Sequence, residues 1–154
     1  MKYLCKLIFR ICIIVMAIAV LSSGMSQENK AFAGKMVWVY SSDQYTYEMG
    51  YYPYVDEYSP VGPIIKAEFQ ITDLNYNGQY VCMGFKNYNN NVGWIVLWSY
   101  DYDANGKVIS KFDRHGRYSD ADFDYVMAGS VEEKLWQAAF NRVVERRIEK
   151  NKEK

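Results

Sequence analysis

The sequence is poor in the residues that most often carry chemistry. It has one histidine, His115, and three cysteines among 154 residues, so a single chain cannot build a site with two histidine ligands. It contains no glycine-rich phosphate loop, no dinucleotide fingerprint, no paired-cysteine motif and no G-x-S-x-G nucleophile motif. We therefore expect a protein that is not an enzyme, with no catalytic residue, no cofactor and no metal.

An excess of charge of one sign is also missing. Eighteen Lys and Arg residues balance eighteen Asp and Glu residues, so the composition does not favour nucleic-acid phosphates as a partner. What is abundant is hydrophobic and aromatic: these classes make up 50% and 17% of the chain, which is too much for a disordered protein. The length suits one folded domain.

The longest uncharged apolar run lies near the start of the chain. Three basic residues precede Ile11–Leu21, and a basic start followed by a run of this length is typical of a secretory signal peptide. A membrane-spanning helix needs about 20 apolar residues, so a retained anchor is the weaker alternative. We predict a leader over residues 1–33, cleaved after Gly24 or Ala33. The protein would then be exported to the periplasm, the cell surface or the medium, without a stable membrane anchor.

Cleavage of this leader would leave Cys82 as the only thiol. No disulfide could then form within the mature chain, and its core alone would have to hold the domain together. Cys82 stands in an apolar run, Tyr80–Met83. This position predicts a small buried hydrophobic residue and not a reactive thiol.

The middle of the chain has the pattern of a strand meander. Apolar and polar residues alternate from Ile65 to Thr72, as in a strand with one buried face. Asn77-Gly78 is a hairpin signal because both residues tolerate positive φ. The remaining expected elements are strands at 36–40, 44–49, 79–86, 94–98 and 107–112, a polar loop at 87–91, a turn at 103–106, and a loop or irregular edge strand at 51–63.

The end of the domain has the pattern of a helix. Ser130 and Glu133 form a capping box, and the residues that follow are apolar on about half of the helix circumference. We expect Trp136 and Phe140 to press into the sheet and the packing to stop near Val144. The fold class is therefore α+β: an antiparallel meander sheet of five or six strands with a C-terminal α-helix packed on one face. This single domain spans residues 34–145, and residues 146–154 form a charged, solvated tail.

Three acidic segments deserve a functional interpretation. Asp101–Gly106 matches the first half of a calcium loop, but Phe112 stands where the bidentate glutamate is required; a hairpin turn is the favoured interpretation and a calcium site the alternative. The alternating aspartates in 120–124 suit a wet loop before the helix. His115 follows Asp113 closely, yet no activated nucleophile accompanies them, so a turn histidine is favoured.

Tyrosine is the most unusual feature of the sequence. Six tyrosines crowd into one short region: Tyr45, Tyr47, Tyr51, Tyr52, Tyr54 and Tyr58. Tyrosine suits half-buried strands, where aromatic cross-strand pairs stabilise a sheet. It also suits recognition surfaces, because it offers a large contact area and a polar tip at low entropic cost. These six residues are the candidate protein-contact surface.

Several segments together resemble a known family. They are the first strand with Trp38–Asp43, the Tyr54–Asp56 segment, the hairpin Tyr102–Val108 and the Gly129–Glu133 helix start. In this order they resemble the small secreted bacterial proteins grouped with surface-adhesin protein E. The resemblance implies an exported α+β domain that attaches to host proteins. Unlike the adhesin, this chain has no lipidation cysteine after its apolar run and no cysteine pair.

The sequence thus predicts an exported, non-enzymatic binding domain, adhesin-like in its role, with another protein as its partner. An envelope protein that inhibits a hydrolase is the alternative hypothesis. A small hydrolase that uses Asp113 and His115 is a remote third.

Overall fold

The structure, a computed structural model, describes residues 35–153. The predicted leader, residues 1–33, and its two cleavage sites lie outside the described residues.

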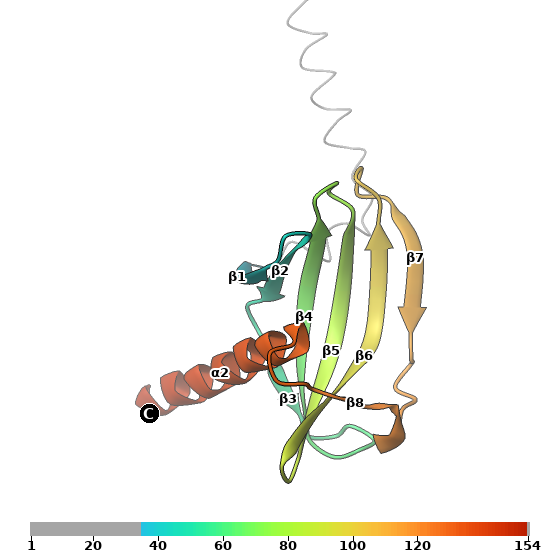
Figure 1. The fold of residues 1–154 in the computed structure, drawn as a ribbon. Helices are drawn as coiled ribbons and strands as arrows, with labels where there is room; N and C mark the ends of the chain where they lie inside the picture. Colours follow the sequence, from blue (N-terminus) through green and yellow to red (C-terminus); the bar gives the residue numbers. More distant parts are fainter. Residues whose placement is uncertain (1–34, 154) are drawn as a thin grey trace, which may run out of the picture. The chain divides into compact units, whose positions relative to one another are not determined.

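Over the described range the chain forms one antiparallel sheet and one long helix (Figure 1). The elements are β1 (Met36–Ser41), β2 (Tyr45–Gly50), β3 (Tyr54–Asp56), β4 (Ile64–Asp73), β5 (Gly78–Tyr88), β6 (Asn91–Tyr102), β7 (Val108–Asp113), the short 3-10 helix η2 (Asp120–Asp122), β8 (Asp124–Tyr125) and α2 (Val131–Lys152). Six of the eight strands follow one another in the meander order β1-β2-β4-β5-β6-β7. The predicted α+β fold class is confirmed, with two additional short strands.

Both additional strands continue an interrupted edge of the sheet. β2 pairs with the second half of β4, from Phe69 to Asp73, and β3 pairs with its first residues, Ile64 to Lys66. Pro53 is buried between them, and a proline cannot donate to a strand ladder. Residues 51–63, expected to be a loop or an irregular edge strand, therefore contain a short edge strand, β3, and loop residues on either side of it. In the same way, β7 and β8 pair with opposite ends of β6.

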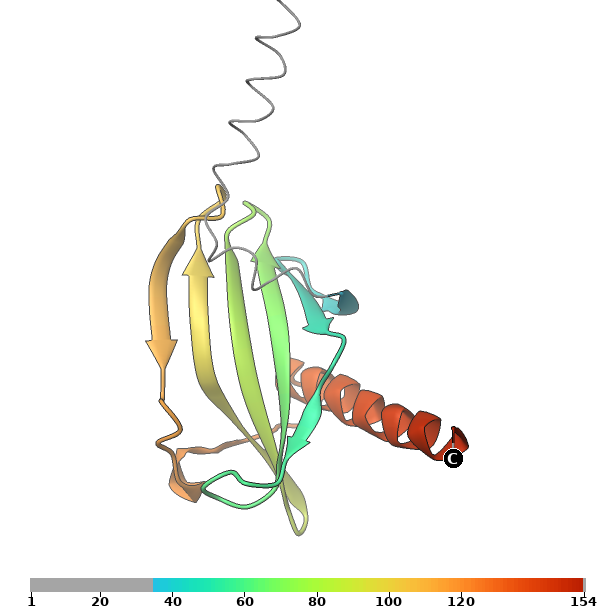
Figure 2. The same ribbon diagram turned by 180° about the vertical axis from the view of Figure 1, so that it is seen from behind.

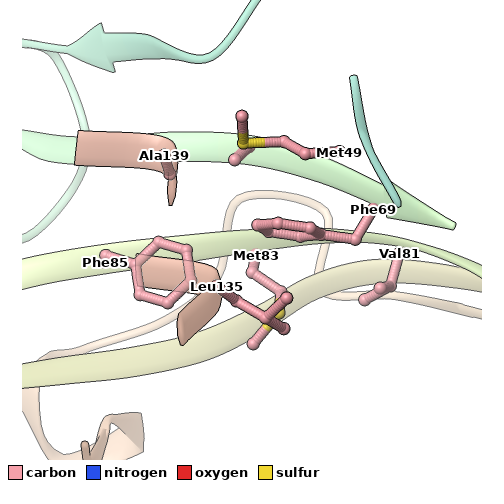
Figure 3. Packing of buried hydrophobic residues seen from close by; sticks show 8 residues of the cluster. Met49, Phe69, Val81, Met83, Phe85, Leu135 and Ala139 are labelled. Carbon is pink, nitrogen blue, oxygen red and sulfur yellow. The ribbon is translucent and has the colours of Figure 1, made fainter. Parts of the chain in front are cut away.

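The core lies between the sheet and α2. Its buried residues are Met49, Ala67, Phe69, Val81, Met83, Phe85, Leu135 and Ala139 (Figure 3). The rings of Phe69 and Phe85 meet edge to face, with their centroids 6.3 Å apart. Both side chains are almost completely buried, and each such burial stabilises the fold by roughly 1.5–3 kcal/mol. The period-two pattern from Ile65 onward correctly predicted which residues of β4 face this core.

Helix α2 begins as expected but packs through a different set of residues. The Ser130 hydroxyl accepts a hydrogen bond from the Glu133 amide at 3.2 Å, while the Glu133 carboxylate accepts from the Gly129 amide at 2.7 Å. The buried residues Leu135, Ala139 and Val143 are spaced four apart, so they form one stripe.

The prediction for Phe140 was wrong, and the prediction for Trp136 holds only in part. Phe140 is 38% exposed, because it lies on the helix flank beside the buried stripe; Trp136 packs against the core but is only partly buried. The buried stripe ends at Val143, so the packing stops near Val144 as expected; the helix itself continues to Lys152, so the charged segment expected to be a tail is mostly helical. Its C-terminal turns extend past the side of the sheet (Figures 1 and 2).

The opposite face of the sheet has a smaller core. Ile64, Cys82, Ile95 and Leu97 are buried there. The loops before β4 and after β7 cover them with Val61, Tyr118 and Phe123, and in Figure 2 these loops lie at one end of that face. β6 thus packs on both sides, as its apolar run predicted. The polar loop expected at 87–91 is mostly strand, since β5 and β6 are joined by Asn89 and Asn90 alone.

Candidate functional site

The structure distributes the six predicted tyrosines over several surroundings. Tyr51 and Tyr52 contact α2, Tyr47 lies on the helix-covered face, Tyr45 stands at the β1–β2 turn, Tyr54 lies at the edge strand β3, and Tyr58 is in the loop that follows it. The structure does not gather them on one face.

Tyr51 and Tyr52 hold the second half of α2. The guanidinium carbon of Arg142 lies 4.1 Å from the centroid of the Tyr51 ring, and that of Arg146 lies 5.0 Å from the Tyr52 ring. Arg146 Nη1 also donates a hydrogen bond to the Pro53 carbonyl at 3.2 Å. Cation–π contacts of this kind contribute about 0.5–2 kcal/mol each. These two tyrosines therefore have a structural role, although Tyr52 remains 67% exposed.

Tyr47 is part of a stacked pair near the start of α2. Its ring stacks on Tyr40 at 5.9 Å, and the Lys134 ammonium lies 3.5 Å from the Tyr40 ring centroid. Burial, followed by the nearby Tyr45 and Glu132, raises the pKa of the Tyr47 hydroxyl. Tyr47 therefore stays protonated and uncharged as part of the packing.

Tyr54 and Tyr58 are the more exposed members of the group. Tyr54 is 53% exposed, and partial burial raises the pKa of its hydroxyl against the opposing effect of Lys66. Lys66 itself pairs with Asp56 at 2.6 Å. Tyr58 is 97% exposed at the loop tip. Its ring is available to a partner and has no visible structural role.

A groove opens where the β1–β2 turn meets the β4–β5 turn. We call it the hairpin groove; its lining residues are Ser42, Gln44, Tyr45, Thr46, Glu48, Thr72, Asp73, Leu74 and Tyr76. Its volume of about 360 Å³ is at the lower end of the range for small-molecule sites. Tyr45 is the one predicted contact residue that lines it.

The register of two strands explains why these residues meet. Thr46 of β2 pairs directly with Thr72 of β4, and Glu48 pairs with Gln70. Successive side chains alternate between the faces of a strand, so Thr46, Glu48 and Thr72 share the face that α2 does not cover. Tyr76 is 78% exposed and lines the groove from the β4–β5 turn, whereas the Tyr45 ring lies 6.4 Å from the Tyr47 ring, on the side of the sheet that α2 covers.

The backbone at Tyr76 is unusual. Its φ is +62°, in the left-handed region that side chains with a Cβ rarely adopt. The Asp73 carboxylate holds this turn by accepting hydrogen bonds from the amides of Asn75 and Asn77 at 2.8 and 2.9 Å. The hairpin that the sequence predicted at this position is present, since β4 and β5 pair up to Thr72 and Gly78. The positive φ, however, is taken by Tyr76 and not by Asn77 or Gly78.

The β6–β7 turn repeats the same hydrogen-bond scheme. Asp103 accepts from the amides of Asn105 and Lys107, each at 2.9 Å, and its own amide donates to the Lys107 carbonyl. The residue equivalent to Tyr76 is Gly106, with φ +77°. One turn thus has glycine where the backbone requires it, and the other has tyrosine at the edge of a groove.

The charged groups of the hairpin groove are all acidic. Asp73 is occupied by its own turn, and its hydrogen bond from the Asn77 side chain holds the pKa of the carboxyl below its usual value. Glu48 is partly buried as a residue, and no hydrogen bond or ion pair joins its side chain to another residue within 35–153. Among the residues that the structure describes, no lysine, arginine or histidine lines the groove. The groove is therefore lined by an acidic residue, Glu48, by Tyr76 and by several residues with hydroxyl groups.

The other residues considered for chemistry have ordinary structural surroundings. Burial raises the pKa of the Cys82 thiol to about 12, which suppresses the reactive thiolate. His115 lies on an exposed turn, with its Nδ1 3.5 Å from Asp113. Asp101 lies in strand β6 and accepts a hydrogen bond from the Gln79 side chain at 2.8 Å.

The aspartates before α2 fasten a loop. Asp120 accepts from Lys86 at 2.6 Å and from Tyr88 at 2.8 Å, and Asp122 lies 3.3 Å from Arg114. These contacts hold the 120–124 segment, expected to be a wet loop, on the end of the sheet. In residues 35–153 no three His, Cys, Asp or Glu side chains come close enough together to hold a metal ion. Nor does any helix in this range have the length and apolarity needed to cross a membrane.

Sequence reasoning did not single out Glu48, Thr72 or Tyr76. Each is an ordinary strand or turn residue in its own segment, and they meet only through the pairing of β2 with β4. The one available signal was a bulky tyrosine inside an Asn-rich turn. A search of protein-family models, of curated proteins and of solved structures finds no match to this chain.

Proposed function

We propose that this chain is an exported, non-catalytic binding domain whose partner is another protein. The observation that carries the proposal is the exposure of large aromatic rings on the first part of the domain. Trp38, Tyr52, Tyr54 and Tyr58 are 62%, 67%, 53% and 97% exposed. Tyrosine and tryptophan dominate the energetically important residues of protein interfaces, and hydrophobic rings in contact with water favour association.

Two further observations support a role without catalysis. The Cys82 thiol is buried and its pKa is raised to about 12, so it is a poor nucleophile at neutral pH. The His115 side chain is 77% exposed, and its ion-pair partner is the adjacent Asp113. A general base must hold the group whose proton it accepts within hydrogen-bond reach, and this exposed turn presents His115 to solvent.

Export is tested separately from binding. The full chain, with a C-terminal tag, is expressed in the cells that produce it, the cells are fractionated, and the N-terminus of the recovered protein is sequenced. A mature form that begins after Gly24 or Ala33 outside the cytosol supports the proposal. A full-length chain confined to the cytosol would overturn it.

Binding is tested with matched aromatic variants. The resemblance to the surface-adhesin protein E family makes host matrix proteins the first partners to assay, by surface plasmon resonance on the purified protein. We expect Trp38→Ser or Tyr58→Ser to weaken capture about tenfold or more. Phe112→Ser is the control, because Phe112 is 45% exposed on β7 at the other side of the sheet. Equal capture by all three variants would contradict an interface on the first part of the domain, and selective capture of an envelope hydrolase would favour the inhibitor alternative instead.

A further inference from the structure

We propose that this domain forms a homodimer in which the α2 helices of two chains pack side by side in antiparallel orientation. The surface that carries the inference is a stripe along α2 that faces away from the sheet, and we call it the free flank. Five of its six residues are exposed and the first is partly buried. Its members are Glu133, Gln137, Phe140, Val144, Arg147 and Asn151.

The free flank is distinct from the stripe of α2 that packs on the sheet. Successive residues of an α-helix are rotated by about 100°, so the free flank lies roughly 120° around the helix axis from the buried residues Leu135, Ala139 and Val143. In Figures 1 and 2 the C-terminal turns of α2 also extend past the side of the sheet. Another molecule can therefore approach this side of the helix.

The centre of the free flank is apolar. Phe140 and Val144 are each 38% exposed, and the neighbouring Ile148 is 50% exposed. The Phe140 ring also meets the Trp136 ring, with their centroids 5.8 Å apart. Apolar side chains that contact water favour association. The residues of the free flank are spaced alternately four and three apart, which is the repeat with which two helices pack together over several turns.

The charge along α2 favours a second copy of the same helix as the partner. Its first turn is acidic, with Glu132 and Glu133, and its last turn is basic, with Lys150 and Lys152. Arg147 belongs to the basic end, and within residues 35–153 no ion pair joins it to another side chain. Two parallel copies would bring like charges together, whereas two antiparallel copies place the acidic start of each helix beside the basic end of the other. The helix dipoles favour the same arrangement.

Other charged groups in the second half of α2 are already used within the chain. Arg142 Nη1 lies 3.0 Å from the Glu145 carboxylate and 3.8 Å from that of Glu149. Arg146 donates a hydrogen bond to the Pro53 carbonyl at 3.2 Å. These contacts lie away from the free flank, so a second helix could pack there without breaking them.

A two-fold axis makes the free flank complementary to itself. With the axis at the level midway between Phe140 and Val144, each of these residues contacts the other one on the partner chain, and Gln137 faces Arg147 of the partner chain. Glu133 then lies beside the basic last turn of the partner helix. Because both chains use the same surface, the interface closes on two copies and does not continue into a filament.

The test measures the mass of the protein, purified from the cells that produce it, by sedimentation equilibrium over about 1–500 µM. We expect the weight-average mass to rise with concentration from that of one chain to that of two. A mass of one chain throughout this range would overturn the inference, and so would a mass that continues to rise beyond two chains.

Two variants with matched controls locate the interface. Val144→Glu places a charge at the apolar centre of the free flank and keeps a good helix former there, so the dissociation constant of the dimer should rise at least about tenfold. Arg147→Glu brings acidic groups of the two chains together and should raise it about threefold or more. Ile109→Glu and Lys107→Glu, at exposed positions on and just before β7, should leave it unchanged. Equal dissociation constants in the flank variants and their controls would contradict the proposed interface.

The orientation of the helices is tested by cross-linking. Gln137→Cys and Arg147→Cys chains are mixed in equal amounts and treated with a short bismaleimide, and the joined peptides are identified by mass spectrometry; Cys82 is buried and reacts slowly. Antiparallel packing predicts that links between positions 137 and 147 dominate. Dominant links between two copies of the same position would show parallel packing and overturn the inference.

A lipid surface is the alternative occupant of the free flank. The protein is sedimented with phosphatidylglycerol vesicles, because an apolar stripe beside basic residues can also bind anionic lipid. A protein that stays monomeric in solution and binds these vesicles through Val144 would overturn the dimer. None of these results bears on capture of another protein through Trp38 and Tyr58, so this inference and the proposed function can fail separately.

Discussion

The left-handed backbone at Tyr76 predicts a reversed order of stability for its glycine and alanine variants. A residue with a Cβ costs about 1–2 kcal/mol in this conformation, and the φ of +62° places Tyr76 there. Glycine avoids this cost but gives up about 0.5–1 kcal/mol through the larger entropy of its unfolded chain. Both variants lose the same ring, which is already 78% exposed. Tyr76→Gly should therefore be more stable than Tyr76→Ala by about 0.5–1 kcal/mol.

The matched control is Tyr45, an exposed tyrosine on the neighbouring strand β2. At an ordinary strand position glycine is the poorer residue, so Tyr45→Gly should be less stable than Tyr45→Ala by about 0.5–1 kcal/mol. Urea unfolding followed by tryptophan fluorescence gives all four free energies of unfolding. Thermal melts should show the same order, with a separation of roughly 2–6 °C within each pair.

The test depends on which Tyr76 variant, glycine or alanine, has the larger free energy of unfolding. If Tyr76→Gly unfolds more easily than Tyr76→Ala, the left-handed conformation is absent and the equivalence with the Gly106 turn is wrong.

Three further predictions concern the core, the acid limit and the thiol. Leu135→Ala should lower the free energy of unfolding by about 2–5 kcal/mol in urea titrations, because the Leu135 residue is only 2% exposed. Phe140→Ala should lower it by about 1 kcal/mol, because Phe140 is 38% exposed. Equal losses would contradict the observed orientation of α2. The hydrogen bond from Lys66 holds the pKa of Asp56 below its usual value. The stabilisation that the ionised Asp56 gives the fold is therefore complete above the unfolded pKa of about 4 and is lost as pH falls through the folded pKa. Asp56→Asn should flatten this acid part of the curve of unfolding free energy against pH, and an unchanged curve would count against the Lys66–Asp56 pair. Labelling of Cys82 by a thiol reagent at pH 8 should be at least about a hundredfold slower in the folded protein than in urea, whereas comparable rates would mean that the thiol is accessible.

Much of the fold could be predicted because single-segment patterns determine it. The alternation from Ile65 to Thr72 and the two-sided apolar run around Ile95 directly reflect burial on one or two faces of a strand. The cap at Ser130 fixed the start of α2. Phe140 was misplaced because the apolar arc of the helix is wider than the stripe that the sheet covers, and the sequence does not say which part of the arc is buried.

The hairpin groove could not be predicted, because no local pattern contains it. Glu48 and Thr72 come together through the register of β2 against β4, and two residues of slip would bring different side chains together. The tyrosines were recognised as a group by composition, yet their roles depend on distant residues. Arg142 and Arg146 lie about 90 residues further along the chain and turn Tyr51 and Tyr52 into packing residues.

The interrupted borders of the sheet have a consequence for crowded solutions of this protein. In the described part of the chain, one border consists of β1, with a bulge between Trp38 and Tyr40, and the short β3; the other consists of β7 and β8. A strand from another molecule could pair along only a few residues before the ladder changes direction or stops, and short, irregular borders of this kind template fibril growth poorly. We therefore expect concentrated samples to remain free of ordered aggregates while the native fold persists.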